Sequence, residues 1–167
     1  GFEQSTTDWR EVIDHPEAQA AIEDECSKCH MPMARYSANV NGGSGSVFAH
    51  LPIGSGDEPQ DLLAADGVSC TLCHQITEEG LGTEESLVGG FRIDETRFEG
   101  ERAIYGPFEP DDGLLHMMRS ATGFRQTEST HIQESELCAT CHTLITHTLG
   151  PGGVIIGELP EQVPYQE

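Results

Sequence analysis

Six cysteines and three histidines of this chain form one motif that occurs three times. Each copy reads Cys-x-x-Cys-His, and the copies span residues 26–30, 70–74 and 138–142. This motif is typical of covalent attachment of a c-type haem. The two thiols, placed on one helical turn, add to the two vinyl groups of a haem, and the histidine binds its iron. The three copies use all six cysteines, so the sequence predicts three covalently bound haem c groups.

Two other roles of the cysteines have to be weighed against haem. A disulfide framework can use six cysteines in an exported chain, but it does not require a histidine after every second cysteine. Two Cys-x-x-Cys units can form a four-thiolate zinc site, but three units leave one without a partner. Haem is therefore the favoured interpretation. The predicted attachment residues are Cys26, Cys29, Cys70, Cys73, Cys138 and Cys141, and the predicted proximal ligands are His30, His74 and His142.

The remaining histidines are candidates for the second axial ligand of each iron. The chain has eight histidines, so five remain for three irons. An iron with two histidine ligands suits electron transfer, whereas an iron with one can bind a small molecule. Core packing is the alternative role for each of these side chains. The candidate distal ligands are His50 in the apolar segment 47–53, His116 beside two methionines, His131 before the third motif and His147 after it.

The composition offers little material for an ordinary hydrophobic core. Only 36% of the 167 residues are hydrophobic and 6% are aromatic, and the chain contains 19 glycines and 9 prolines. The length suits one domain. Three haems would supply large apolar surfaces of their own. We therefore expect one mainly α domain, residues 1–167, with few short helices and much irregular loop wrapped around three haems. Without haem, we expect the chain not to fold.

Helices are expected before each motif. Asp14 as N-cap and Pro16 in the first turn predict a helix that runs to the first motif and stops at Pro32. Residues 59–65 predict a second short helix. Thr130 and Gln133 fit a capping box, which predicts a helix that starts there and carries the third motif.

The other segments are expected to be irregular. Glycine and asparagine predict a loop over residues 36–60. Weak alternation over residues 87–93 indicates either a small β-hairpin or a surface excursion. The apolar segment 104–108 is expected to pack on a haem face, and residues 157–165 are expected to be extended.

The net charge of −21 limits the possible partners. So acidic a chain is poorly suited to nucleic acid and to anionic membrane surfaces. Two interpretations remain: a solvated acidic surface, or an acidic docking face for a cationic redox protein. No run of about 18 or more apolar residues is present, so we expect no membrane span. Covalent haem attachment takes place outside the cytoplasm. We therefore expect a periplasmic or extracellular protein whose signal peptide has been removed.

Two segments resemble multihaem c-type cytochromes. They are residues 66–76, around the second motif, and residues 131–144, around the third. The sequence pattern of these segments is similar to that of the tetrahaem cytochromes and octahaem hydroxylamine-oxidising enzymes of ammonia oxidisers. The resemblance implies haems packed edge to edge or in parallel stacks, mostly with two axial histidines, that relay electrons. At matching positions it implies the same six cysteines and three proximal histidines, with His131 as the distal ligand of another haem.

The chain departs from that group in having three attachment sites rather than four or eight. Residues 161–165 resemble a segment that continues into more chain in relatives. We therefore expect either a fragment of a longer chain or a subunit whose missing haems come from a partner. The first functional hypothesis is an electron carrier between redox proteins. The alternatives are an enzyme whose one open haem acts on a small nitrogen or sulfur compound, and a subunit of an extended haem array or filament.

Overall fold

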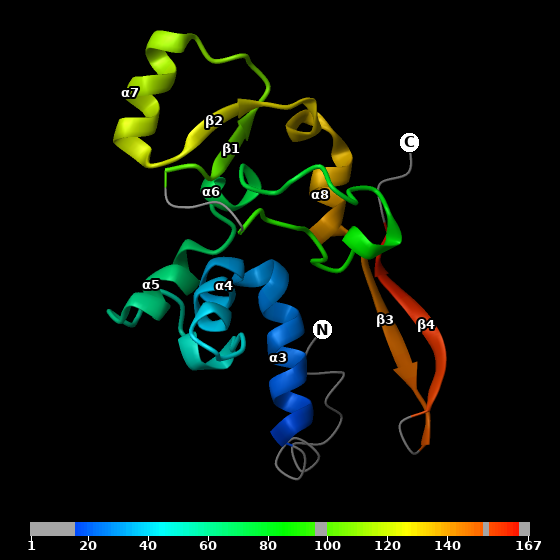
Figure 1. Cartoon of the computed structure of the whole chain (residues 1–167). Coiled ribbons are helices and arrows are strands. Elements are labelled where there is room, and N and C mark those ends of the chain that lie inside the picture. The colour runs from blue at the N-terminus through cyan, green and yellow to red at the C-terminus, as the bar shows by residue number, and fades with distance from the viewer. Residues whose placement is uncertain (1–15, 96–99, 152–153, 164–167) are drawn as a thin grey trace. The chain divides into compact units, whose positions relative to one another are not determined.

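The computed structural model of the chain describes residues 16–95, 100–151 and 154–163 (Figure 1). The chain divides into two compact units, residues 1–69 and residues 70–167. The described residues combine helices with short strands, so the expectation of a mainly α fold is confirmed only in part. That the two units act as one three-haem domain stays a prediction.

The first unit is helical in its described part. Its elements are α3 (Pro16–His30), α4 (Pro32–Val40), the 3-10 turn η1 (Phe48–His50) and α5 (Pro59–Asp66). Helix α4 packs against both α3 and α5. Among the described residues, Met31, Ala34 and Ala64 form the buried apolar cluster between them, with half-buried Val47 and Leu63 around it. The core of this unit is therefore small.

Prolines begin the helices of the first unit much as the sequence predicts. Helix α5 starts at Pro59 and follows the predicted range, and α3 ends at His30 before Pro32. Pro32, however, also occupies the first turn of α4, because proline already has the φ angle of a helix and lacks only a donor that the first turn does not use. The loop predicted from residue 36 is therefore wrong as far as Val40. The predicted N-cap, Asp14, lies outside the described residues.

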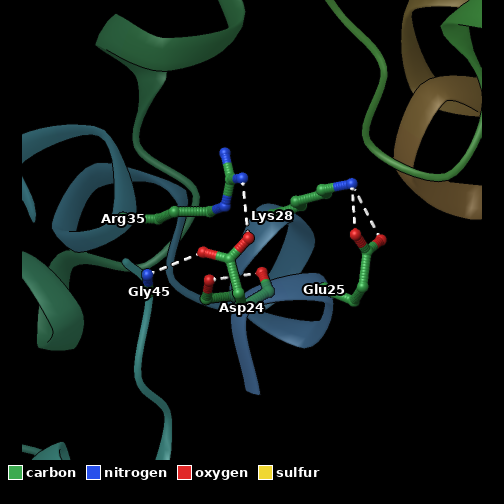
Figure 2. Close-up of polar contacts among 6 residues, drawn as sticks. Asp24, Glu25, Lys28, Arg35 and Gly45 are labelled. Carbon is green, nitrogen blue, oxygen red and sulfur yellow. Dashed lines mark hydrogen bonds and ion pairs between the residues drawn. The ribbon is translucent and has the colours of Figure 1, made fainter. Parts of the chain in front are cut away.

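Two carboxylates of α3 fix the chain that returns after α4. The Glu23 side chain, in a residue only 6% exposed, accepts hydrogen bonds from the backbone N–H groups of Val47 and Phe48 and from the Ser46 hydroxyl, at 2.9–3.0 Å. Asp24 accepts from Arg35 at 2.9 Å and from the backbone N–H of Gly45 at 2.7 Å (Figure 2). Both carboxylates lie directly before the first Cys-x-x-Cys-His motif, so they anchor the helix that carries it.

The second unit alternates helical turns with strands. Its elements are α6 (Cys70–Cys73), the 3-10 turn η2 (Glu84–Ser86), β1 (Ala103–Gly106), α7 (Asp112–Thr122), β2 (Arg125–Glu128), the 3-10 turn η3 (Thr130–Gln133), α8 (Ser135–His142), β3 (Leu144–Leu149) and β4 (Ile155–Gln162). Strands β1 and β2 are parallel, with Ala103 opposite Arg125 and Gly106 opposite Glu128. Helix α7 makes the connection between these strands and packs on β2 (Figure 1).

A β-hairpin is present, but not where the sequence predicts it. Strands β3 and β4 pair antiparallel, with His147 opposite Glu158, and every residue of β4 is exposed. In residues 87–93 the chain forms turns instead, and only Ile93 makes a ladder contact, an isolated bridge to Ile76. Val88 even has a φ of +56°, a conformation that a β-branched residue in a regular strand does not adopt. Of the two structures expected for residues 87–93, the hairpin is therefore wrong, and a surface excursion is the alternative that remains. The expectation of an extended end is confirmed as far as Gln162.

The third motif lies on a shorter helix than the capping box predicts. Thr130 is inside η3, and the residue before that turn, Ser129, makes no side-chain capping bond. The backbone then becomes extended at Glu134, with φ −95° and ψ 143°, and α8 begins at Ser135. His131 and the third motif therefore lie on different elements. Within the described ranges, no helix is both long enough and apolar enough to cross a bilayer.

Candidate functional site

All three Cys-x-x-Cys-His motifs adopt helical turns. The first forms the C-terminal end of α3 and the third forms that of α8. The second forms α6, and the backbone N–H of His74 continues that turn by donating to Cys70 O at 3.0 Å. A helical turn places residues three apart on one face, which is the arrangement that two thioether bonds to one haem require. No disulfide joins any of the six cysteines, all of which are described.

The cysteines of the second unit lie near enough to influence one another. Burial raises the pKa of the Cys73 thiol, and the charges that Cys138 and Cys70 can carry raise it further. Catalytic and redox Cys-x-x-Cys motifs instead have a cysteine of lowered pKa. Cys70 and Cys138 are exposed, so a bulky group can reach them. This environment fits attachment chemistry better than a dithiol redox centre.

His74 is held by two hydrogen bonds to one residue. Its Nδ1 donates to Tyr105 O at 2.5 Å, and the backbone N–H of Tyr105 donates to His74 O at 2.7 Å. Because a carbonyl oxygen can only accept, the ring proton is on Nδ1, and Nε2 is the nitrogen left for a metal. Metal-binding histidines commonly donate their other N–H in this way. The sequence did not identify Tyr105 in this role, because the contact uses backbone atoms that every residue has.

His131 lies close to this pair but is engaged differently. The residue is 3% exposed, and its Nε2 donates to Ile76 O at 2.8 Å while its Nδ1 accepts from the Ser129 hydroxyl at 2.7 Å. Its ring also meets the Tyr105 ring edge to face, with centroids 4.9 Å apart. Both nitrogens thus have partners within the protein. Binding of an iron by His131 would require one of these bonds to be given up.

His50 has the environment of an oriented ligand. It ends η1, and its Nδ1 lies 2.7 Å from Asp61 Oδ1 on α5. An ionised carboxylate only accepts hydrogen bonds, so Nδ1 is the donor and Nε2 remains for another partner. The two side chains are 15% and 23% exposed. The sequence identified His50 as a candidate ligand. It did not identify Asp61 as its partner, because an acidic residue in the first turn of a helix is common and indicates no particular contact.

The other histidines are exposed. His30 and His142 end α3 and α8, and His116 lies on α7. His147 lies on β3 with its Nδ1 4.0 Å from Glu158 Oε1 on β4. None of these four is oriented as closely as His74 or His50. His15 lies outside the described residues.

An acidic hollow of about 700 Å³ lies in the second unit. Its wall includes His131 and four glutamates: Glu78, Glu79, Glu134 and Glu136. Among the described side chains, no three metal-binding groups converge as they would in a zinc or calcium site. The hollow is therefore a strongly negative concavity next to the helix that carries the third motif.

Large apolar side chains are mostly outside rather than inside the described structure. The buried apolar residues are small or few, for example Ala34, Ala64 and Ala103, whereas Phe48, Phe108 and Met117 are among many that are exposed. Each of these side chains could bury its apolar surface against a large apolar group. Three haems would provide large apolar faces for it. The motif geometry, the orientation of His74 and this apolar surface all fit covalent haem.

No family model, curated protein or solved structure matches this chain.

Proposed function

We propose that this chain is an electron-transfer c-type cytochrome with three covalently bound haems. The observation that carries the proposal is the second motif, in which Cys70 and Cys73 share a helical turn and the His74 ring is fixed with Nε2 left for iron. The first and third motifs, at the ends of α3 and α8, repeat the same sequence on the same kind of turn. A haem bound at each site supplies one-electron chemistry at its iron.

The chain's own residues would hold, orient and shield the cofactors. The cysteines fix each haem covalently, and the histidines His30, His74 and His142 bind the irons as proximal ligands. The eight histidines are enough to give each iron a second histidine, which closes it to substrates. An electron carrier needs no open coordination site on its irons, so a number of histidines sufficient to close all three favours electron transfer.

The charge of the chain supports a cationic redox partner. A net charge of −21 and the acidic hollow beside α8 would attract a positively charged protein over a distance of about 10 Å. Such attraction raises association rates and weakens with added salt. We place the protein in the periplasm or outside the cell, where c-type haems are attached.

A second function is favoured by the hydrogen bonds of His131. If both its nitrogens remain bonded to Ile76 and Ser129, four histidines are left for three irons. Two of these four, His116 and His147, are exposed, so an iron that neither of them reaches could keep an open position. Such a haem could act on a small nitrogen or sulfur compound. This alternative is an enzyme rather than an electron carrier.

Carbon monoxide distinguishes the two functions. The experiment uses the chain matured with its haems and records the spectrum of the reduced protein with and without the gas. An electron carrier with two protein ligands on every iron should give the same spectrum in both conditions. A shift of the haem bands corresponding to one of three haems would contradict the carrier and support the enzyme. Stepwise reduction against electrode potential should then resolve three one-electron transitions.

A further inference from the structure

The first unit contains a histidine–carboxylate pair that lies outside all three motifs. His50 Nδ1 and Asp61 Oδ1 are 2.7 Å apart, and both side chains are largely covered. The pair connects η1 with α5, which pack against each other. We propose that Asp61 is a positioning residue, which holds the His50 ring so that Nε2 is presented as the distal ligand of one haem iron. This inference rests on the proposed function.

The surrounding chain restrains the carboxylate. Asp61 lies in the first turn of α5, and Gly56 lies against its other oxygen. A Cβ atom on Gly56 would be 2.1 Å from Asp61 Oδ2, closer than two non-bonded atoms can lie. Only a residue without a side chain leaves the carboxylate where it is. One oxygen of Asp61 is thus held toward His50 while the loop closes over the other.

The partner of Nδ1 differs among the oriented histidines, and the difference has a chemical consequence. His74 donates to a neutral carbonyl, His131 has both nitrogens bonded to protein atoms, and His50 donates to a carboxylate. A carboxylate draws the Nδ1 proton more strongly and makes Nε2 a more basic ligand. A more basic ligand stabilises ferric over ferrous iron. The haem that binds His50 should therefore have a lower potential than it would with a neutral partner.

Two substitutions that each remove one negative charge provide the main test. Asp61→Asn removes the carboxylate that contacts His50, whereas Asp57→Asn removes an exposed carboxylate four residues earlier. In the three-haem protein, Asp61→Asn should shift the ferric–ferrous ratio of one haem about tenfold toward ferrous. That shift corresponds to a rise of about 59 mV for one electron. The other two potentials, and all three in Asp57→Asn, should be unchanged.

Gly56→Ala tests the position of the carboxylate without changing any charge. The added methyl group should displace Asp61 from His50 and raise the same single potential. His50→Ala provides an independent measurement, since one haem should become high-spin and bind carbon monoxide. These results would support Asp61 as a positioning residue rather than as a merely structural ion-pair partner.

The opposing outcomes are equally specific. Three unchanged potentials in Asp61→Asn, or three low-spin haems in His50→Ala, would overturn the inference and leave the proposed function intact. If Asp61→Asn cannot be obtained with haem, Gly56→Ala and His50→Ala decide the question alone. A wild-type chain that binds no haem would overturn the proposed function together with this inference.

Discussion

At the scale of single residues, the carboxylate of Glu23 controls the structure before the first motif. Burial alone would raise its pKa, but hydrogen bonds from Phe48, Gln19, Ser46 and Val47 outweigh burial and lower it. The pKa of Asp24 is lowered in the same way, with burial opposed by Arg35 and by the Gly45 N–H. Both side chains are therefore charged in the folded chain at neutral pH, and their charge contributes to stability.

Replacing Glu23 should destabilise the holoprotein measurably. Glu23→Ala leaves the backbone N–H groups of Val47 and Phe48 without their acceptor, which should lower the free energy of unfolding by about 2–3 kcal/mol at pH 7. Denaturant unfolding followed by circular dichroism measures this loss. Glu25→Gln, at an exposed neighbour paired with Lys28, should have no measurable effect. Equal stability of the Glu23 and Glu25 variants would show that the buried bonds do not stabilise the helix.

The same variant should change the response to acid. Because the pKa of Glu23 is lowered on folding, its contribution is complete above the ordinary value of about 4 and is lost as pH falls through the lowered value. The difference in stability between wild type and Glu23→Ala should therefore shrink as pH falls below about 4. A difference that grows on acidification would have the wrong sign for this explanation.

At the scale of elements, helix ends were easier to predict from sequence than strand pairs. Pro59 fixes the start of α5 through local geometry, and Pro32 separates α3 from α4. The pairing of β1 with β2 depends instead on residues about 20 positions apart, and nothing in either short segment indicates its partner. The β3–β4 hairpin was missed because five residues separate its strands, and the sequence there lacks the two-residue turn that marks a hairpin most clearly.

The N-cap of helix α7 should contribute measurably to the stability of that helix. The Asp111 side chain accepts from the Gly113 N–H at 2.9 Å, and Gly123 ends the helix with a φ of +74°. Asp111→Ala should destabilise this helix by about 1 kcal/mol, because a capping bond is lost. Asp112→Ala removes the same charge one residue later and keeps the cap. Amide hydrogen exchange of residues 113–122 should be faster in the Asp111 variant, whereas equal exchange in both variants would contradict the capping role.

At the scale of the whole molecule, the described core is so small that we expect the haems to contribute much of the stability of the fold. Met31, Ala34 and Ala64 form the buried cluster in the described part of the first unit, and the buried apolar residues described in the second are Leu72, Ile76 and Ala103. Their side chains remove little apolar surface from water, so the balance against chain entropy is poor. Covalent haems would add the missing apolar contact.

The candidate sites and the fold depend on different kinds of information in the sequence. The predicted attachment cysteines and the predicted proximal histidines come from a local motif, which needs no knowledge of distant contacts. Asp61 and Tyr105 could not be identified in the same way, because each acts through a residue far from it in the chain. The assignment of His131 as a distal ligand stays a prediction, and its present hydrogen bonds to Ile76 and Ser129 would have to change for it to hold.

The most direct test of the account is the mass of the intact chain after expression with the c-type haem maturation machinery. We predict a protein that carries three haems through covalent bonds, with no thiol left to react with an alkylating agent. Replacing Cys70 and Cys73 together by serine should reduce the count to two and leave the other four cysteines protected. A chain without covalent haem, whose six cysteines all react, would contradict the account.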